Sequence, residues 1–207
     1  MPVIGDIERD AVTELLNIAI GQAAASLSQL VDDEIKLSVP FVDFLSPSAA
    51  TTRLDQETQG GESVAVRQYF QGQFSGDILL IFPGKRSLEL VRSMLGDALP
   101  LETLTELEQE ALLEVGNIIL NACIGSLANQ LGTPVESSLP AYVRAKGAGI
   151  LGAAAKGGDE ELVMFLHVDF SLTRKDVHGY LAFIMDIDSA NGFLAAVRDY
   201  LKRSLAV

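Results

Sequence analysis

The chain has 207 residues, enough for one large domain or two small ones, and at 48% hydrophobic and 21% charged residues it has the composition of a globular protein. Its formal net charge of −13 argues against nucleic-acid binding, because phosphate backbones require basic patches. It has no N-terminal apolar signal region and no uninterrupted apolar run of membrane-spanning length. The single Cys123 excludes an intrachain disulfide and suits a reducing compartment. We therefore expect a cytoplasmic protein without membrane insertion.

The first half of the chain opens with a long helix over residues 6–30, where apolar residues recur at three- and four-residue spacing and no proline interrupts them. Residues 46–61 are rich in Ser, Thr, Ala and Gly, and we predict a loop there. The other predicted elements are strands over 35–44 (containing Pro40), 62–74 and 77–82, and a short helix over 87–95.

The sequence of the second half predicts the same order of elements as in the first half. Thr105 and Glu108 form a capping box that opens a helix over 106–131. The Ala- and Gly-rich segment 145–158 takes the place of the earlier loop. The remaining predicted elements are strands over 135–143, 162–170 and 180–187, with a turn near His178 between the last two, and a closing helix over 188–203.

A motif in the long helix is repeated at a constant offset. Three residues of the first half, Glu14, Asn17 and Pro40, reappear 100 positions later as Glu114, Asn117 and Pro140. Three positions in one register indicate an internal duplication, with repeats of about 1–99 and 100–207. Neither half would bury the apolar face of a three-stranded sheet alone. We predict one α/β (α+β) domain over residues 1–207 with pseudo-twofold symmetry, in which two long helices pack on a mainly antiparallel sheet.

The repeated motif places a polar stripe on each long helix. In the first helix the stripe runs through Asp10, Glu14, Asn17, Gly21 and Ala24, at steps of three and four residues. A single Glu-x-x-Asn would be an ordinary exposed pair. Asn is a poor choice within a helix, however, because its amide competes for backbone hydrogen bonds. Its recurrence after a Glu among diverged neighbours favours a functional pair.

A carboxylate and an amide one turn apart hold no nucleophile, no histidine base and no complete set of metal ligands. The pair suits a site that another molecule completes with its own electrophile and metal. Phosphoryl hydrolysis has this character, because its transition state needs positioning and charge compensation more than covalent help.

The spacing Asp/Ser-x3-Glu-x2-Asn-x22-Pro resembles the signature of the CheC/CheX/FliY phosphatases of bacterial chemotaxis. The first copy, which starts at Asp10, matches it fully, whereas the second has Glu110 at the first position. A chain with two copies of this signature is similar to CheC, because CheX-type chains carry one copy. The resemblance covers nearly the whole chain.

This resemblance implies hydrolysis of the aspartyl phosphate on a CheY-like response regulator. Asn17 and Asn117 would orient the attacking water, and Glu14 and Glu114 would pair with the regulator's active-site Lys. The docking surface would include Asp10, Gly21 and Glu110. Any Mg²⁺ would be carried by the regulator, so we expect no cofactor and no metal site in this chain. Some relatives also bind CheD, a receptor-modifying deamidase.

Two other classes of function stay open on the sequence. The same helices could hold a phosphorylated regulator, or CheD, without turnover. An unrelated small-molecule hydrolase would need Glu14 and Glu114 in one cleft, about 5–10 Å apart by analogy with glycosidases. His167 and His178 have no further ligand at a recognisable spacing, so we expect ordinary structural roles for them.

Overall fold

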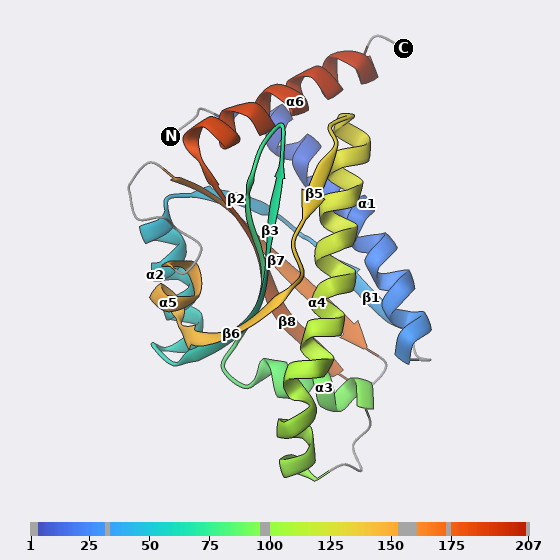
Figure 1. The fold of residues 1–207 in the computed structure, drawn as a ribbon, viewed down its shortest axis with the longest axis vertical. Coiled ribbons are helices and arrows are strands. Elements are labelled where there is room, and N and C mark those ends of the chain that lie inside the picture. The colour runs from blue at the N-terminus through green and yellow to red at the C-terminus, as the bar shows by residue number, and fades with distance from the viewer. Residues whose placement is uncertain (1–3, 32–33, 96–99, 153–160, 173–174, 206–207) are drawn as a thin grey trace.

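The computed structural model describes residues 4–31, 34–95, 100–152, 161–172 and 175–205 (Figure 1). Its first half contains α1 (Asp6–Val31), β1 (Ile35–Ser38), β2 (Val42–Leu45), α2 (Pro47–Thr58), β3 (Glu62–Gly72), β4 (Gly76–Pro83) and α3 (Arg86–Leu95). Its second half contains α4 (Leu101–Leu131), β5 (Val135–Ser137), β6 (Ala141–Lys146), α5 (Gly147–Gly152), β7 (Glu161–Leu172), β8 (Lys175–Asp186) and α6 (Ile187–Leu205).

The strands form one sheet in the order β1-β7-β8-β4-β3-β5, with β2 also paired to β7 and β6 to β3. Every pairing between the described strands is antiparallel, which confirms the predicted mixture of helices and antiparallel sheet. The short strands of each half pair with a long strand of the other half. Both halves also present the same order of elements, as the predicted duplication requires; the duplication itself stays a prediction.

Helices cover both faces of the sheet (Figure 1). The larger core lies between one face and α1, α3, α4 and α6, and the smaller core lies between the other face and α2 and α5. Along β7, Met164 and Leu166 belong to the larger core, whereas Val163 and Phe165 belong to the smaller one. This alternation follows from the two-residue period of a strand. Helices α1 and α4 pack against each other and run in opposite directions (Figure 1).

Helix α4 is long and apolar enough over Thr105–Leu131 to cross a membrane, by length and composition alone. In the structure this helix packs against α1 and the sheet, and Leu112, Val115 and Ile119 are fully buried in the larger core. A buried core helix passes the same test, so its apolar character is explained by the packing seen here.

The prediction of a loop over residues 46–61 is wrong, because α2 occupies most of this range. The Ser46 hydroxyl accepts a hydrogen bond from the Ala49 N–H at 3.2 Å, and Pro47 sits in the first turn. Both features favour a helix start. Gln59 ends the helix in a left-handed conformation. In the second half α5 occupies part of the predicted loop 145–158, and residues 153–160 lie outside the described part of the chain.

The prediction of single strands over 35–44 and 135–143 is also wrong, because each is divided in two, into β1 and β2 in the first half and into β5 and β6 in the second. Two further local predictions differ from the structure. The prediction of a capping box at Thr105 and Glu108 is wrong, because α4 begins at Leu101 and both residues lie inside the helix. Glu108 is buried, and it accepts a hydrogen bond from the Ser87 hydroxyl at 2.6 Å and pairs with Arg144. The prediction of a turn near His178 is also wrong. Strand β8 begins at Lys175, and His178 lies within this strand, opposite Asp169 of β7.

Candidate functional site

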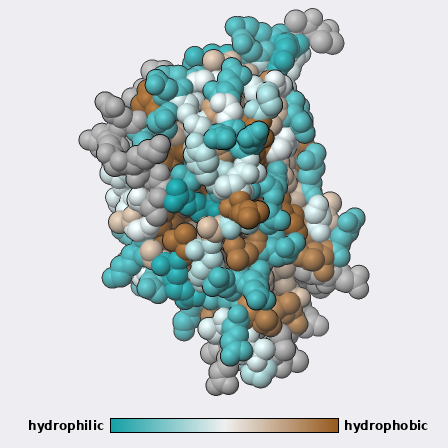
Figure 2. All heavy atoms as spheres, in the orientation of Figure 1, coloured by the Kyte–Doolittle hydropathy of each residue, from teal (hydrophilic) through white to brown (hydrophobic). Residues whose placement is uncertain are grey.

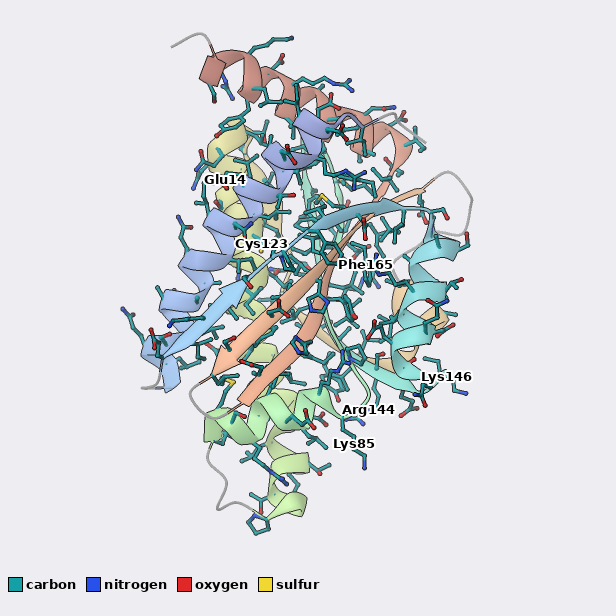
Figure 3. The ribbon with its side chains drawn as sticks, turned by 180° about the vertical axis from the view of Figure 1, so that it is seen from behind. Glu14, Lys85, Cys123, Arg144, Lys146 and Phe165 are labelled. Atoms are coloured by element: carbon teal, nitrogen blue, oxygen red, sulfur yellow. The ribbon has the colours of Figure 1, made fainter. Side chains whose placement is uncertain are left out.

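The first polar stripe lies on the outer side of α1. Asp10, Glu14 and Gly21 are exposed and Asn17 is half-buried, whereas Leu15 and Leu16 point into the core. Figure 3 shows Glu14 on this helix. Within the described residues, the carboxylates of Asp10 and Glu14 have no hydrogen-bond or ion-pair partner. A Cβ built on Gly21 would meet no atom within 4 Å, so the surface next to Asn17 is open.

Asn17 is fixed by the backbone of Val39. Its Nδ2 donates to the Val39 carbonyl at 3.1 Å, and the Val39 N–H donates to its Oδ1 at 3.1 Å. An amide side chain has two N–H donors and two acceptor lone pairs. The pairing with Val39 therefore leaves one N–H and one lone pair to bind something else. It also gives a structural reason for the motif spacing, because Val39 directly precedes Pro40.

The second stripe, on α4, is held differently. Glu110 and Glu114 are exposed and Asn117 is half-buried, as in the first stripe. The position equivalent to Gly21 is Asn121, whose Nδ2 donates to Asn117 Oδ1 at 2.8 Å. Asn121 Oδ1 in turn accepts from Gln68 Nε2 at 3.0 Å. Asn117 is thus positioned by a side chain of its own helix.

The strand segments beside the two stripes also differ. Val39 is buried next to Asn17, whereas its counterpart Leu139, in the β5–β6 connection, is 89% exposed. Figure 2 shows that the face carrying β5, β6 and α4 is mostly hydrophilic, with apolar side chains gathered near its middle. A single exposed apolar side chain is common on protein surfaces, so Leu139 distinguishes the two stripes without itself marking an interface.

The two stripes lie beside opposite edges of the sheet. Asn17 is bonded to the segment between β1 and β2 at the β7 edge, and Asn121 accepts a hydrogen bond from the Ser137 hydroxyl of β5, at the β3 edge. This arrangement argues for two separate surfaces and against one cleft shared by Glu14 and Glu114.

Neither stripe lines the hollow found between the start of α1 and α6. That hollow has a volume of about 580 Å³ and is lined by Gly5, Asp6, Ile7, Glu8, Arg198, Leu201 and Lys202. The stripes are instead part of the open helix surface. Such a surface suits a macromolecular partner better than a small substrate, which binds in concave sites.

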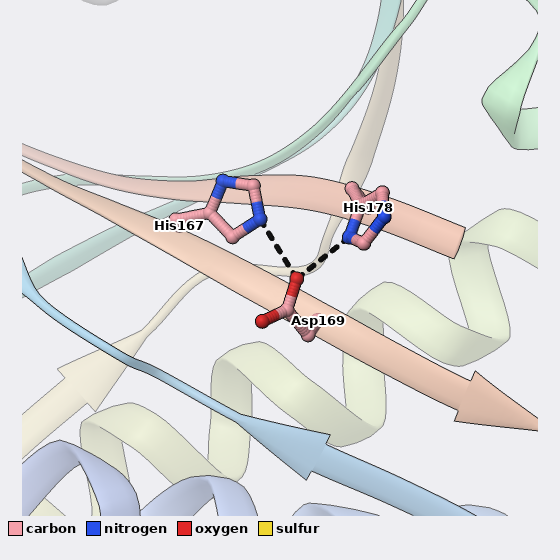
Figure 4. A group of neighbouring side chains, drawn as sticks. All are labelled: His167, Asp169 and His178. Atoms are coloured by element: carbon pink, nitrogen blue, oxygen red, sulfur yellow. Dashed lines mark hydrogen bonds and ion pairs between the residues drawn. The ribbon is translucent and has the colours of Figure 1, made fainter. Parts of the chain in front are cut away.

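Sequence reasoning missed a cluster on the other face of the sheet, where His167, Asp169 and His178 meet (Figure 4). His167 Nε2 and His178 Nδ1 both contact Asp169 Oδ1, at 2.8 and 2.6 Å. Burial raises the pKa of Asp169, but the hydrogen bonds from the two imidazoles outweigh it, so that the pKa lies below its usual range. His167 and Asp169 are two residues apart on one strand. The third member follows only from the register of β7 with β8.

Two residues outside the stripes have structural roles. Cys123 is fully buried, and desolvation raises the pKa of its thiol to about 12, so it is a structural residue. Asp186 ends β8 and accepts a hydrogen bond from the Ser189 N–H at 2.7 Å, which caps the start of α6.

Comparison with known proteins gives matches in sequence. A model of the CheC-like family matches residues 7–42, a stretch that contains the whole first copy of the motif, from Asp10 to Pro40. A Halobacterium salinarum protein named "Putative CheY-P phosphatase CheC1" is 25% identical over 194 residues, which cover 91% of this chain and 96% of that protein. The Bacillus subtilis protein named "CheY-P phosphatase CheC" is 27% identical over 143 residues, 66% of each chain.

The fold is similar to that of a solved structure over almost its entire length. The crystal structure of Thermotoga maritima FliY aligns with a TM-score of 0.74 and 20% sequence identity, covering 98% of this chain and 99% of that one. At this level of identity the likeness concerns the fold.

Proposed function

We propose that this chain, which belongs to the CheC-like family, removes the phosphoryl group from the aspartyl phosphate of a CheY-like response regulator in the cytoplasm. Two of its relatives are named as CheY-P phosphatases. The observation that carries the proposal is the geometry of the first stripe: an amide fixed at two points next to an exposed carboxylate that has no partner among the described residues.

Asn17 is suited to hold a water molecule. Because Val39 fixes the plane of its amide, the second N–H and the second lone pair keep one direction relative to α1. A water held there would attack phosphorus in line. The bond from the water oxygen to phosphorus forms, and the bond from phosphorus to the aspartyl oxygen breaks. The products are the regulator's carboxylate and inorganic phosphate, and the water's proton passes to the phosphate or to solvent. Such positioning is the main requirement of phosphoryl transfer.

Glu14 and Asp10 serve docking. Both are exposed on the same side of α1 as Asn17. Glu14 would form an ion pair with the regulator's active-site Lys, and Gly21 leaves room for the partner's backbone to approach. The Mg²⁺ that compensates the phosphoryl charge would be bound by the regulator.

The second stripe would act in the same way through Glu114 and Asn117. Glu110 replaces Asp10 there, and Asn117 is held by Asn121, which is a side chain and not the backbone. A side-chain support is more easily displaced than a backbone one. We therefore assign the larger share of the activity to the first stripe.

Binding without turnover is the second candidate function. It is favoured by one observation, which is that the Asn17 amide already joins α1 to Val39 and so has a structural use. In that case the stripes would hold a phosphorylated regulator, or CheD, and leave its phosphate intact.

The test follows the loss of aspartyl phosphate from a phosphorylated CheY-like regulator of the same organism, with Mg²⁺ present. Glu14→Gln and Glu114→Gln keep the shape of the side chain and remove its charge, and neither disturbs a hydrogen bond within the described residues. We expect Glu14→Gln to slow the reaction by at least about tenfold at limiting protein, equivalent to about 1.4 kcal/mol, and Glu114→Gln to have the smaller effect. The double variant should be inactive.

The matched control is Asp199→Asn, which removes one negative charge from the exposed surface of α6. It should leave the rate unchanged. If the double variant accelerates phosphate loss as well as the wild type, the stripes are not the site. If the wild type binds the phosphorylated regulator tightly but does not accelerate phosphate loss, the protein is a binding module.

A further inference from the structure

The sheet face that carries α2 and α5 has an uncovered region. On β7, Val163 and Phe165 lie in the core beneath these helices, and the next residues on the same face are His167 and Asp169. His178 lies opposite Asp169 on β8. The side chains of His167, Asp169 and His178 are 23%, 33% and 47% exposed. The cluster is therefore open to solvent on one side, and it lies outside both polar stripes.

We propose that His167, Asp169 and His178 bind a divalent transition-metal ion. Three ligand atoms, His167 Nε2, Asp169 Oδ1 and His178 Nδ1, all lie within 4.8 Å of one another. Two imidazoles and one carboxylate make a set that suits Zn²⁺ and its first-row neighbours, whereas Mg²⁺ prefers oxygen ligands alone.

The distances fit this purpose after a small adjustment. Metal–ligand bonds of about 2.0–2.2 Å place the ligand atoms of a tetrahedral site about 3.3–3.6 Å apart. The contacts of 2.6 and 2.8 Å to Asp169 would lengthen by less than about 1 Å to reach that spacing. The two imidazole nitrogens, which lie within 4.8 Å of each other, would also move to that spacing. The fourth position would face solvent.

Aromatic neighbours hold His167 in place. The Phe41 ring stacks on the His167 ring, with centroids 6.2 Å apart and an interplanar angle of 26°. Tyr180 meets the same ring edge-on, with centroids 5.3 Å apart. A ligand whose orientation is set by packing loses little freedom when it binds a metal, which favours affinity.

In the absence of metal, protons occupy the positions that the ion would take. Each imidazole nitrogen that donates to Asp169 must give up its hydrogen before it can bind a metal. In a neutral imidazole the hydrogen moves to the other ring nitrogen, and an imidazolium loses it to solvent. Metal binding should therefore weaken as the pH falls.

The experiment uses the full chain without an affinity tag, treated with a chelator and then titrated with ZnCl₂ by calorimetry. Bound Zn²⁺ can be assigned to this cluster because the chain has two histidines in all and its one cysteine is buried. We expect one Zn²⁺ per chain. Replacing Zn²⁺ with Co²⁺ should give the visible absorption bands of a tetrahedral or five-coordinate site.

His178→Gln and Asp169→Asn each remove one ligand and leave a polar side chain of similar size. We expect either change to weaken Zn²⁺ binding by at least about 10–100-fold, the loss known for groups that merely orient a ligand. Asp199→Asn on α6 serves as the control and should bind Zn²⁺ as the wild type does. Zn²⁺ should also raise the unfolding temperature of the wild type and not that of Asp169→Asn.

The proposal is overturned if no Zn²⁺ binds, or if His178→Gln binds it as tightly as the wild type does. The cluster would then be a hydrogen-bonded carboxylate only. None of these measurements involves a response regulator, so their outcome is independent of the proposed phosphatase activity.

Discussion

The side-chain amide of Asn17 forms two hydrogen bonds with the backbone of Val39, each 3.1 Å long. One residue thus joins α1 to the segment between β1 and β2. Alanine offers neither bond, and an aspartate would accept from the Val39 N–H but repel its carbonyl. The residue best placed to position a water is therefore also a structural link, and the two roles must be measured separately.

Asn17→Ala should destabilise the protein. Val39 is buried, so the variant leaves a backbone N–H and a carbonyl without their partner. We expect the free energy of unfolding, measured by urea denaturation, to fall by about 1–3 kcal/mol. The control is Glu14→Ala, which lies one turn away without a partner in the described chain and should stay within about 0.5 kcal/mol of the wild type. Equal stability of the two variants would mean that the pairing with Val39 contributes nothing.

Gly116→Ala should also destabilise the protein, although alanine is the better helix former. A Cβ at Gly116 would lie 2.5 to 2.9 Å from three side-chain carbons of Val66, which is fully buried in β3. Overpacking costs about 1–3 kcal/mol and the gain in helix propensity is about 1 kcal/mol, so we expect a net loss of up to about 2 kcal/mol. Thermal or urea unfolding measures it.

Two variants check this explanation. Gly125→Ala lies on the same helix, and its Cβ would meet no atom within 4 Å, so it should stabilise the protein by up to about 1 kcal/mol. Val66→Ala should relieve part of the clash, because it removes the two methyl carbons and keeps only the Cβ, so the double variant with Gly116→Ala should be less destabilised than the sum of the two changes. Additive effects would show that the contact with Val66 is not the cause.

Arg144→Met should be more harmful than Glu108→Gln, although the two residues are partners. Glu108 is 3% exposed and Arg144 is 45% exposed. Removing the arginine leaves a buried carboxylate without its counter-charge, for which we expect a loss of about 3 kcal/mol. Removing the glutamate charge leaves an arginine that water can solvate, and the amide oxygen can still accept from Ser87. We expect a loss of about 1–2 kcal/mol there.

Chemical denaturation of the two single variants and the double variant decides this point. The double variant should recover part of the stability lost in Arg144→Met, because the buried charge is then absent. A loss in Glu108→Gln that exceeds the loss in Arg144→Met would contradict the assignment of Glu108 as the buried partner.

The helices were predictable where apolar periodicity is continuous. The sequence places α1, α3 and α6 within a few residues, because each has one apolar side and no interior proline. It misses α2, since composition there is typical of a loop and the helix depends on local capping at Ser46 and Pro47. It misreads Glu108 for a similar reason: the Thr-x-x-Glu pattern is local, but the partner of Glu108 comes from β6.

The candidate site was predictable only as a pattern. The spacing of Asn17 and Pro40 is visible in the sequence, but the bond to Val39 is not, because it depends on the path of the chain after α1. The cluster of His167, Asp169 and His178 needs the register of β7 with β8, which the whole sheet determines. Long-range pairing is thus the information that local patterns lack.

The ion pair between Glu8 of α1 and Arg198 of α6 should make the free energy of unfolding depend on pH in the acid range. The hydrogen bond from Arg198, then that from the Gly5 N–H, holds the pKa of Glu8 below its ordinary value. A carboxylate whose pKa is lower in the folded than in the unfolded protein stabilises the folded state at pH values above its unfolded pKa. This contribution is lost as the pH falls through the folded pKa.

Because Arg198 is 50% exposed, we expect Glu8→Gln to lower the free energy of unfolding by only about 0.5 kcal/mol at pH 7. The difference from the wild type should begin to shrink as the pH falls below about 4.3, the ordinary pKa of glutamate, and should vanish below the folded pKa. Urea denaturation at several pH values measures it, and the effect of Glu8→Gln should shrink in an Arg198→Met background. An effect that persists unchanged at low pH would show that Glu8 stabilises the protein by packing and not by charge.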